Sequence, residues 1–106
     1  MQQRYFRLIV AAMAFRAMAI PAHAATIQIT MENLVISPAE VTAKVGDTIE
    51  WVNKDVLAHT ATARNGAFDV MLPPNKTIGL TLKNAGSVDY YCRFHPNMKA
   101  TLKIEP

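Results

Sequence analysis

The chain has 106 residues, a net charge of +3, 51% hydrophobic residues and a single cysteine. This length suits one small domain and excludes a multidomain enzyme. Three arginines in the first 24 residues account for the whole net charge, because every acidic residue lies beyond them and the remaining charges balance. The basic charge is therefore no reason to expect nucleic-acid binding.

The first 24 residues have the pattern of a secretory signal. Two arginines precede a short apolar run, and the segment ends in Ala22-His23-Ala24, a small-x-small sequence that favours cleavage before Ala25. Arg16 interrupts the apolar run, which falls short of the about 20 residues that span a bilayer. We predict a signal peptide over residues 1–24, export to the periplasm, and a mature domain over residues 25–106 without a membrane anchor.

From residue 25 onward, hydrophobic and polar residues alternate, which is typical of strands with one buried face. Asn65-Gly66 predicts a hairpin, because this pair tolerates positive φ. We expect an all-β domain, a Greek-key β-sandwich of about seven or eight short strands with no helix. The residues that share the hydrophobic faces are Ile27, Ile29, Met31, Val41, Ala43, Val45, Ile49, Trp51, Ile78, Leu80, Leu82, Val88, Tyr90, Cys92, Ala100, Leu102 and Ile104.

One stretch carries ligand chemistry at a close spacing. Cys92, His95 and Met98 are spaced Cys-x2-His-x2-Met, in a loop that we expect to run from a strand ending at Cys92 to one beginning at Met98. After removal of the signal, His59 is the only other histidine. Two imidazoles, a thiolate and a weak axial thioether are the known ligand set of blue-copper electron-transfer sites. In an exported protein a lone cysteine cannot form an internal disulfide, which also favours a metal ligand.

Each of these residues has an ordinary structural alternative. Cys92 alone could be a small buried apolar residue, and His59 alone could be a polar residue at the start of a strand. Met98 could fill the core, as we expect for Met31 and Met71. The joint spacing within an exported all-β chain favours the metal site over these alternatives. Large aromatic residues on the hydrophobic faces, by contrast, are expected to be core residues and not electron relays.

The sequence resembles the cupredoxins and, within them, the amicyanin-like group. The resemblance is carried by Trp51-Val52-Asn53 leading to His59, and by the run Tyr-Tyr-Cys-Arg-Phe-His-Pro-Asn-Met over residues 90–98. It covers essentially all of residues 25–106. It implies a β-sandwich that holds one type 1 copper ion and serves as a soluble electron carrier in the bacterial periplasm.

The resemblance also implies a role for each ligand candidate. His59, Cys92 and His95 would be equatorial ligands, and Met98 would be the axial ligand. The sequence departs from the family beside the first histidine, where Ala58 replaces a frequent proline and Thr60 replaces a frequent asparagine that ties the two ligand loops. We expect the Thr60 backbone N–H to reach the Cys92 sulfur and the Thr60 hydroxyl to replace that tie.

Two other functions compete with electron transfer. A hydrolase with Cys92 and His95 as nucleophile and base is disfavoured by the size of the chain and by the thioether, which has no role in such chemistry. We therefore expect no enzyme. A periplasmic copper carrier or copper-resistance protein would use the same ligands, and the sequence leaves this alternative open.

The expected partners are a redox donor and a redox acceptor that dock near His95 on a monomeric protein. Leu57, Ala58, Phe94 and Pro96 neighbour the ligand candidates and are expected to form an apolar rim there. By analogy with the family, the donor would be an amine dehydrogenase. No nucleic acid and no membrane contact is expected after signal cleavage.

Overall fold

The structure, a computed structural model, describes residues 23–106. These residues form nine β-strands and contain no helix. In chain order the strands are β1 (Thr26–Glu32), β2 (Val35–Ser37), β3 (Glu40–Lys44), β4 (Thr48–Asn53), β5 (His59–Ala63), β6 (Asp69–Leu72), β7 (Thr77–Thr81), β8 (Gly86–Cys92) and β9 (His95–Glu105). The described part of the chain thus has no helix long and apolar enough to cross a membrane. Residues 1–22 lie outside the described residues, so the signal peptide over residues 1–24 stays a prediction.

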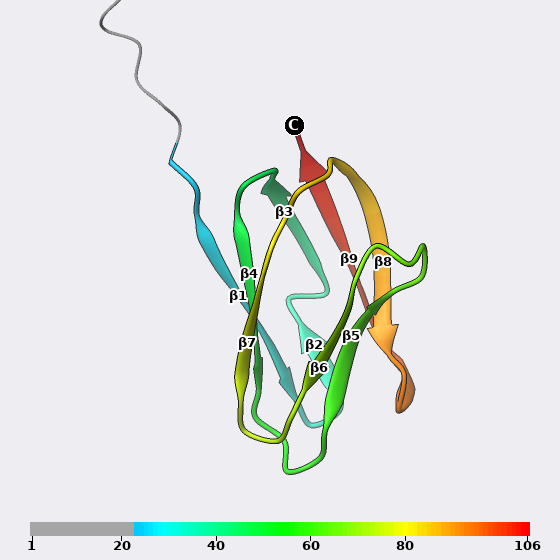
Figure 1. The fold of residues 1–106 in the computed structure, drawn as a ribbon. Coiled ribbons are helices and arrows are strands. Elements are labelled where there is room, and N and C mark those ends of the chain that lie inside the picture. Colours follow the sequence, from blue (N-terminus) through cyan, green and yellow to red (C-terminus); the bar gives the residue numbers. More distant parts are fainter. Residues whose placement is uncertain (1–22) are drawn as a thin grey trace, which may run out of the picture.

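The strands of residues 23–106 form two sheets that pack face to face as a sandwich (Figure 1). The four-stranded sheet has the order β2-β1-β4-β7, and the five-stranded sheet has the order β3-β9-β8-β5-β6. Strands that are distant in sequence pair in parallel, β1 with β4 and β3 with β9, so the chain crosses between the sheets in Greek-key fashion. The predicted all-β sandwich is confirmed.

The structure contains one strand that the sequence did not predict, and its last strand begins earlier than predicted. The structure adds β2, a three-residue strand over Val35–Ser37 that is too short to show a clear alternating pattern, and this brings the described strands to nine. The prediction that the last strand begins at Met98 is wrong. It begins at His95, because Cys92 and His95 pair directly across the turn between β8 and β9.

The hydrophobic core lies between the two sheets and contains the predicted aromatic residues. Trp51 and Tyr90 are fully buried. The indole N–H of Trp51 donates to the Tyr90 hydroxyl over 3.2 Å, and the two rings meet edge-on with their centroids 5.6 Å apart. Burial raises the pKa of Tyr90 to about 12. These rings serve as packed core residues, as the sequence predicts.

Two residues that the sequence assigns to the hydrophobic interior are exposed. Met71 is 47% exposed, because its neighbour Leu72 in β6 is buried and side chains alternate along a strand. The prediction that Met71 fills the core is therefore wrong, whereas Met31 is fully buried as predicted. Val45 is 41% exposed, since it follows the last residue of β3 and precedes the turn at Gly46.

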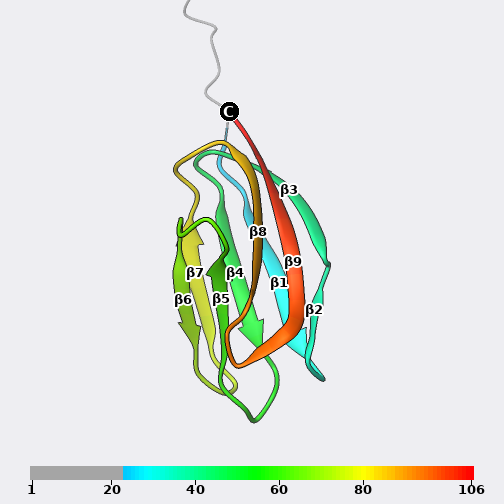
Figure 2. The ribbon, with the colours of Figure 1, turned by 90° about the vertical axis from the view of Figure 1, so that its right-hand side faces the viewer.

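The two ends of the sandwich carry different connections. The predicted hairpin at Asn65-Gly66 joins β5 to β6 at one end, and Gly66 has the expected positive φ of 81°. The opposite end carries the β1–β2 turn (residues 33–34), the β4–β5 connection (residues 54–58) and the β8–β9 turn (residues 93–94) (Figure 1, Figure 2). We call this the ligand end, because three of the predicted ligands lie there.

Candidate metal centre

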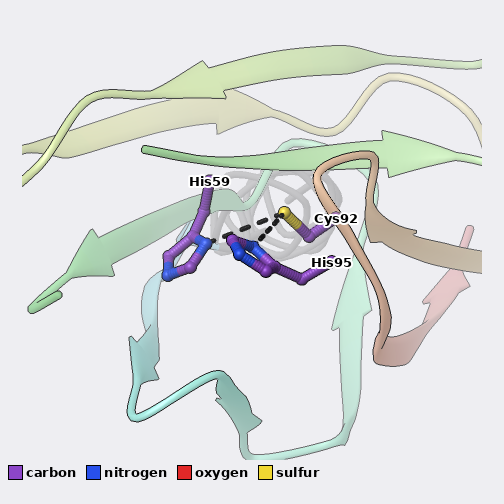
Figure 3. A group of neighbouring side chains, drawn as sticks. All are labelled: His59, Cys92 and His95. Atoms are coloured by element: carbon purple, nitrogen blue, oxygen red, sulfur yellow. Dashed lines mark hydrogen bonds between the residues drawn. The ribbon is translucent and has the colours of Figure 1, made fainter. Parts of the chain in front are cut away.

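Three predicted ligands come together at the ligand end. His59 begins β5, Cys92 ends β8 and His95 begins β9, and these strands are neighbours in the five-stranded sheet. The Cys92 sulfur lies 3.7 Å from Nδ1 of His59 and 3.8 Å from Nδ1 of His95. One donor atom from each residue lies within 4.8 Å of the other two. The three side chains therefore point toward one another (Figure 3).

The cluster is buried on one side and reaches the surface on the other. His59 and Cys92 are fully buried, whereas His95 is partly exposed. The two imidazole rings meet edge-on, with their centroids 5.2 Å apart. Among the three residues, His95 is the one through which the cluster meets solvent.

Met98, the predicted axial ligand, is a buried thioether in the strand that His95 begins. It is 2% exposed and shares the inward face of β9 with Ala100 and Leu102, as alternation along a strand requires. A buried position three residues beyond His95 suits the predicted role. The axial coordination itself stays a prediction.

The donor atoms of the cluster fit a copper ion. A thiolate sulfur and imidazole nitrogens are donors that copper prefers. Cys92 is the only cysteine and forms no disulfide, so its sulfur is available as a ligand. The backbone N–H of Thr60 donates to that sulfur over 3.4 Å, as predicted.

Thr60 also ties together the two segments that carry the ligand candidates. Its hydroxyl accepts a hydrogen bond from the Arg93 N–H over 2.8 Å, which confirms the prediction that the hydroxyl replaces the missing asparagine. The same hydroxyl lies 2.9 Å from that of Thr62, which donates to Asp69 over 2.7 Å. The Asp69 carboxylate also accepts from Arg93 Nε over 3.2 Å. Hydrogen bonds from Thr62 and Arg93 hold the pKa of Asp69 below its ordinary value.

Asp55 belongs to this site and is absent from the sequence-based prediction. Its Oδ2 lies 2.8 Å from Nε2 of His59, the ring nitrogen that does not face Cys92. Burial alone would raise the pKa of Asp55, but hydrogen bonds from His59 and from the backbone of Asn33 and Leu34 outweigh it and lower that pKa. In the sequence, Asp55 is only one residue of a polar turn before His59. No sequence pattern indicates that its carboxylate contacts the His59 ring.

Asn53 fixes the connection that carries Asp55. The Asn53 side chain is buried, and its amide nitrogen lies 2.9 to 3.3 Å from the carbonyl oxygens of Leu57, Leu72 and Pro73. Its Oδ1 accepts the Asp55 N–H over 2.9 Å. One amide thus joins the end of β4, the β4–β5 connection and the end of β6, so β5 starts from a fixed segment.

Comparison with known proteins places the chain in a family. Residues 5–104 match the family of the cupredoxin-like domain. Amicyanin of Paracoccus versutus is 34% identical over 92 residues, which cover 81% of this chain and 68% of that protein. The chain is an amicyanin-like cupredoxin. The crystal structure of amicyanin from Paracoccus versutus agrees with the fold of this cupredoxin at a TM-score of 0.66 and 32% identity, over 81% of this chain and 85% of that chain.

A second relative is named for its part in methylamine utilization. The methylamine utilization protein MauL of Methylorubrum extorquens is 30% identical to this cupredoxin over 108 residues, which cover 96% of this chain and 95% of that protein. Family membership and the cluster of two histidines and one cysteine together support one type 1 copper ion as the cofactor. The predicted cofactor is confirmed.

Proposed function

We propose that this cupredoxin is a periplasmic electron carrier that holds one copper ion through His59, Cys92 and His95 as equatorial ligands and Met98 as axial ligand. The observation that carries the proposal is the convergence of one sulfur and two imidazole nitrogens within 4.8 Å. A copper ion bound there supplies one reversible electron step between Cu(II) and Cu(I). The protein supplies the fixed positions of the donor atoms.

The scaffold around the cluster suits electron transfer more than catalysis. All three converging residues start or end strands of one sheet, and the Thr60 hydroxyl links β5 to the turn that follows Cys92. Donors held on strands move little, which keeps the site similar in both oxidation states. Three strong donors and one axial thioether also leave no open position for a substrate. We therefore propose an electron carrier and not an enzyme.

Exposed apolar side chains at the ligand end support docking of redox partners there. Val56 is 81% exposed, Leu57 49% and Phe94 48%, and they lie in the β4–β5 connection and in the β8–β9 turn beside His95. Patches of exposed apolar residues mark interaction sites. We propose that a redox donor and a redox acceptor dock here in turn on a monomeric protein. Because one relative is a methylamine utilization protein, an amine-oxidising enzyme is the proposed donor.

The periplasmic location rests on the predicted signal peptide. The Ala22-His23-Ala24 sequence before Ala25 supports cleavage at that point. The intact mass of protein from a periplasmic extract is expected to equal that of a chain beginning at Ala25. Recovery only from membranes, at the mass of the full chain, would contradict export.

The proposed function is tested by adding one equivalent of Cu(II) to the purified protein. We expect an intense visible band from charge transfer between the Cys92 thiolate and copper, which disappears on reduction and returns on reoxidation. Cys92→Ser is expected to lose the band and most of the copper affinity, because a hydroxyl replaces the soft donor. Met71→Leu, a change at an exposed methionine of the same domain, is the matched control and should keep the band.

The same sample separates an electron carrier from a copper carrier. An electron carrier keeps its copper through many redox cycles in the presence of a chelator such as bathocuproine disulfonate, whereas a copper carrier releases Cu(I) to it. Wild-type protein that binds one Cu(II) without a strong visible band would overturn the type 1 site. Rapid loss of Cu(I) to the chelator would instead favour the copper carrier.

A further inference from the structure

One carboxylate lies between a proposed copper ligand and a turn of the opposite sheet. Oδ2 of Asp55 lies 2.8 Å from Nε2 of His59, at the start of β5 in the five-stranded sheet. The backbone N–H of Asn33 donates to Oδ1 over 2.7 Å, and that of Leu34 donates to Oδ2 over 3.2 Å. These two residues form the turn between β1 and β2 in the four-stranded sheet. The carboxylate therefore connects both sheets at the ligand end.

We propose that Asp55 is a positioning residue that sets the tautomer and orientation of His59 and anchors this ligand to the β1–β2 turn. The proposal rests on the proposed function, in which His59 holds copper through Nδ1. It adds a residue that contributes no donor atom to the metal and that acts through His59.

The first part of the argument concerns the imidazole proton. A neutral imidazole carries one N–H, and a metal needs the other nitrogen free. A carboxylate 2.8 Å from Nε2 accepts that N–H, which leaves the lone pair on Nδ1, 3.7 Å from the Cys92 sulfur. His59 is fully buried, so water does not compete for the Nε2 proton. Asp55 thus prepares His59 for the metal before any metal arrives.

The second part concerns the β1–β2 turn. Asn33 and Leu34 have φ of 54° and 62°, and leucine rarely adopts this left-handed conformation. Both backbone N–H groups point at one carboxylate, which compensates this unfavourable conformation. The Lys54 N–H also donates to the Met31 carbonyl over 2.8 Å, so the segment that carries Asp55 is held against β1 on its other side. The turn and His59 therefore depend on the same side chain.

The third part concerns charge. A carboxylate that accepts the N–H of a ligand histidine makes the imidazole a stronger donor, and this favours the more highly charged ion. Loss of the Asp55 charge should therefore weaken Cu(II) binding more than Cu(I) binding. The reduction potential should rise as a result.

The tautomer can be measured in the wild-type protein without metal. Long-range ¹H–¹⁵N NMR spectra of the apoprotein at about pH 8, above the ordinary titration range of histidine, should show His59 protonated at Nε2. A predominantly Nδ1-protonated His59 in the folded apoprotein would overturn the proposal. This measurement requires no variant and no copper.

Charge-removing variants test the effect on copper. Asp55→Asn should raise the dissociation constant for Cu(II) about 10- to 100-fold, the usual effect of losing an outer-shell carboxylate. Each tenfold loss of Cu(II) affinity relative to Cu(I) raises the potential of this one-electron couple by about 59 mV. Asp89→Asn removes the same charge from an exposed residue of β8 that pairs with Thr101, and it should leave both quantities unchanged.

The anchoring of the turn is tested separately. In Asp55→Ala, the amide protons of Asn33 and Leu34 should exchange with solvent faster, because both lose their acceptor. Adding Leu34→Gly should restore part of the lost stability, since glycine accepts positive φ, but it should not restore the potential. If Leu34→Gly also restored the reduction potential, Asp55 would act only through the turn. That result would overturn the direct role of Asp55 at His59.

The outcomes separate this inference from the proposed function. A wild-type protein without the charge-transfer band would remove the copper site itself, whatever the Asp55 variants do. A wild-type protein with the band, and an Asp55→Asn protein with unchanged Cu(II) affinity and potential, would overturn the role of Asp55 alone. A shift of equal size in Asp89→Asn would show a general effect of charge and would also overturn it.

Discussion

Thr60 contacts both segments of the site, once through its backbone and once through its side chain. Its backbone N–H donates to the Cys92 sulfur, and its hydroxyl accepts from the Arg93 N–H. Both contacts join residues 32 or 33 positions apart. The Thr60 hydroxyl thus supplies a tie between the two segments, which is the role that the resemblance assigns to an asparagine at this position.

Thr60→Val tests this tie. Valine keeps the branched shape but leaves the Arg93 N–H without an acceptor, so the free energy of unfolding should fall by about 1 to 2 kcal/mol. Urea unfolding of the apoprotein measures the change. Thr101→Val, which removes a hydroxyl from an exposed pair with Asp89, is the control and should cost less than about 0.5 kcal/mol. An equal loss of unfolding free energy in both variants would show that the Thr60 tie stabilises the protein no more than an exposed hydrogen bond does.

Met98 should tune the copper site without being required for binding. A long thioether contact contributes little affinity, but its loss disfavours Cu(II) more than Cu(I). Met98→Leu preserves the buried volume and should keep both copper and the visible band, while the reduction potential moves upward. Voltammetry and the visible spectrum of the loaded protein measure the two effects. Complete loss of copper would contradict a weak axial role.

One carboxylate joins the start of β1 to the turn between β3 and β4. Asp47 Oδ1 accepts the Ala25 N–H over 2.8 Å, and Oδ2 accepts the Lys44 N–H over 2.9 Å. The hydrogen bonds from Ala25 and Lys44 hold the pKa of Asp47 below its ordinary value. In the proposed mature protein, Ala25 would carry the terminal ammonium group, so signal cleavage would place a positive charge beside this carboxylate.

This junction predicts a pH dependence of stability. Because the pKa of Asp47 is lower in the folded state, its stabilising contribution is complete above the unfolded pKa of about 3.9 and is lost as the pH falls through the folded pKa. Urea unfolding of the apoprotein between pH 7 and pH 2.5 should show a steeper acid loss for the wild type than for Asp47→Asn. The difference should be larger in protein that begins at Ala25 than in protein that keeps the preceding residues. Parallel pH profiles would contradict the role of Asp47.

The apolar ligand end of the sandwich and the opposite end should differ in their effect on electron transfer. In the proposed electron carrier, two copies would exchange an electron through the partly exposed His95, so a like charge added to this surface of both copies would make their encounter repulsive. Val56→Lys, at an 81% exposed position of the ligand end, should slow self-exchange about tenfold or more at low ionic strength. NMR line broadening in mixtures of reduced and oxidised protein measures the rate.

The control for this prediction lies at the other end of the sandwich. Val45 is 41% exposed and follows β3, where its N–H donates to the Glu105 carbonyl near the C-terminus. Val45→Lys adds the same charge and should leave self-exchange within a factor of about two. If Val45→Lys slowed the rate as much as Val56→Lys, electron transfer through the ligand end would be contradicted.

The fold class and the ligand candidates could be predicted from the sequence alone. Alternating hydrophobic residues depend only on neighbours two positions apart, so the all-β sandwich and its core aromatics follow from local pattern. The close spacing of Cys92, His95 and Met98 is also local. His59 followed by elimination, because the proposed mature chain has no other histidine outside this motif.

The role of Asp55, in contrast, could be found only from the three-dimensional structure. The contacts of Asp55 with Asn33 and Leu34 cross 22 and 21 positions and join two sheets. No local pattern encodes such a contact, since it depends on how the sheets pack and where each turn ends. The short β2 and the early start of β9 have the same origin, because cross-strand pairing, and not the pattern within a segment, defines a strand of a few residues.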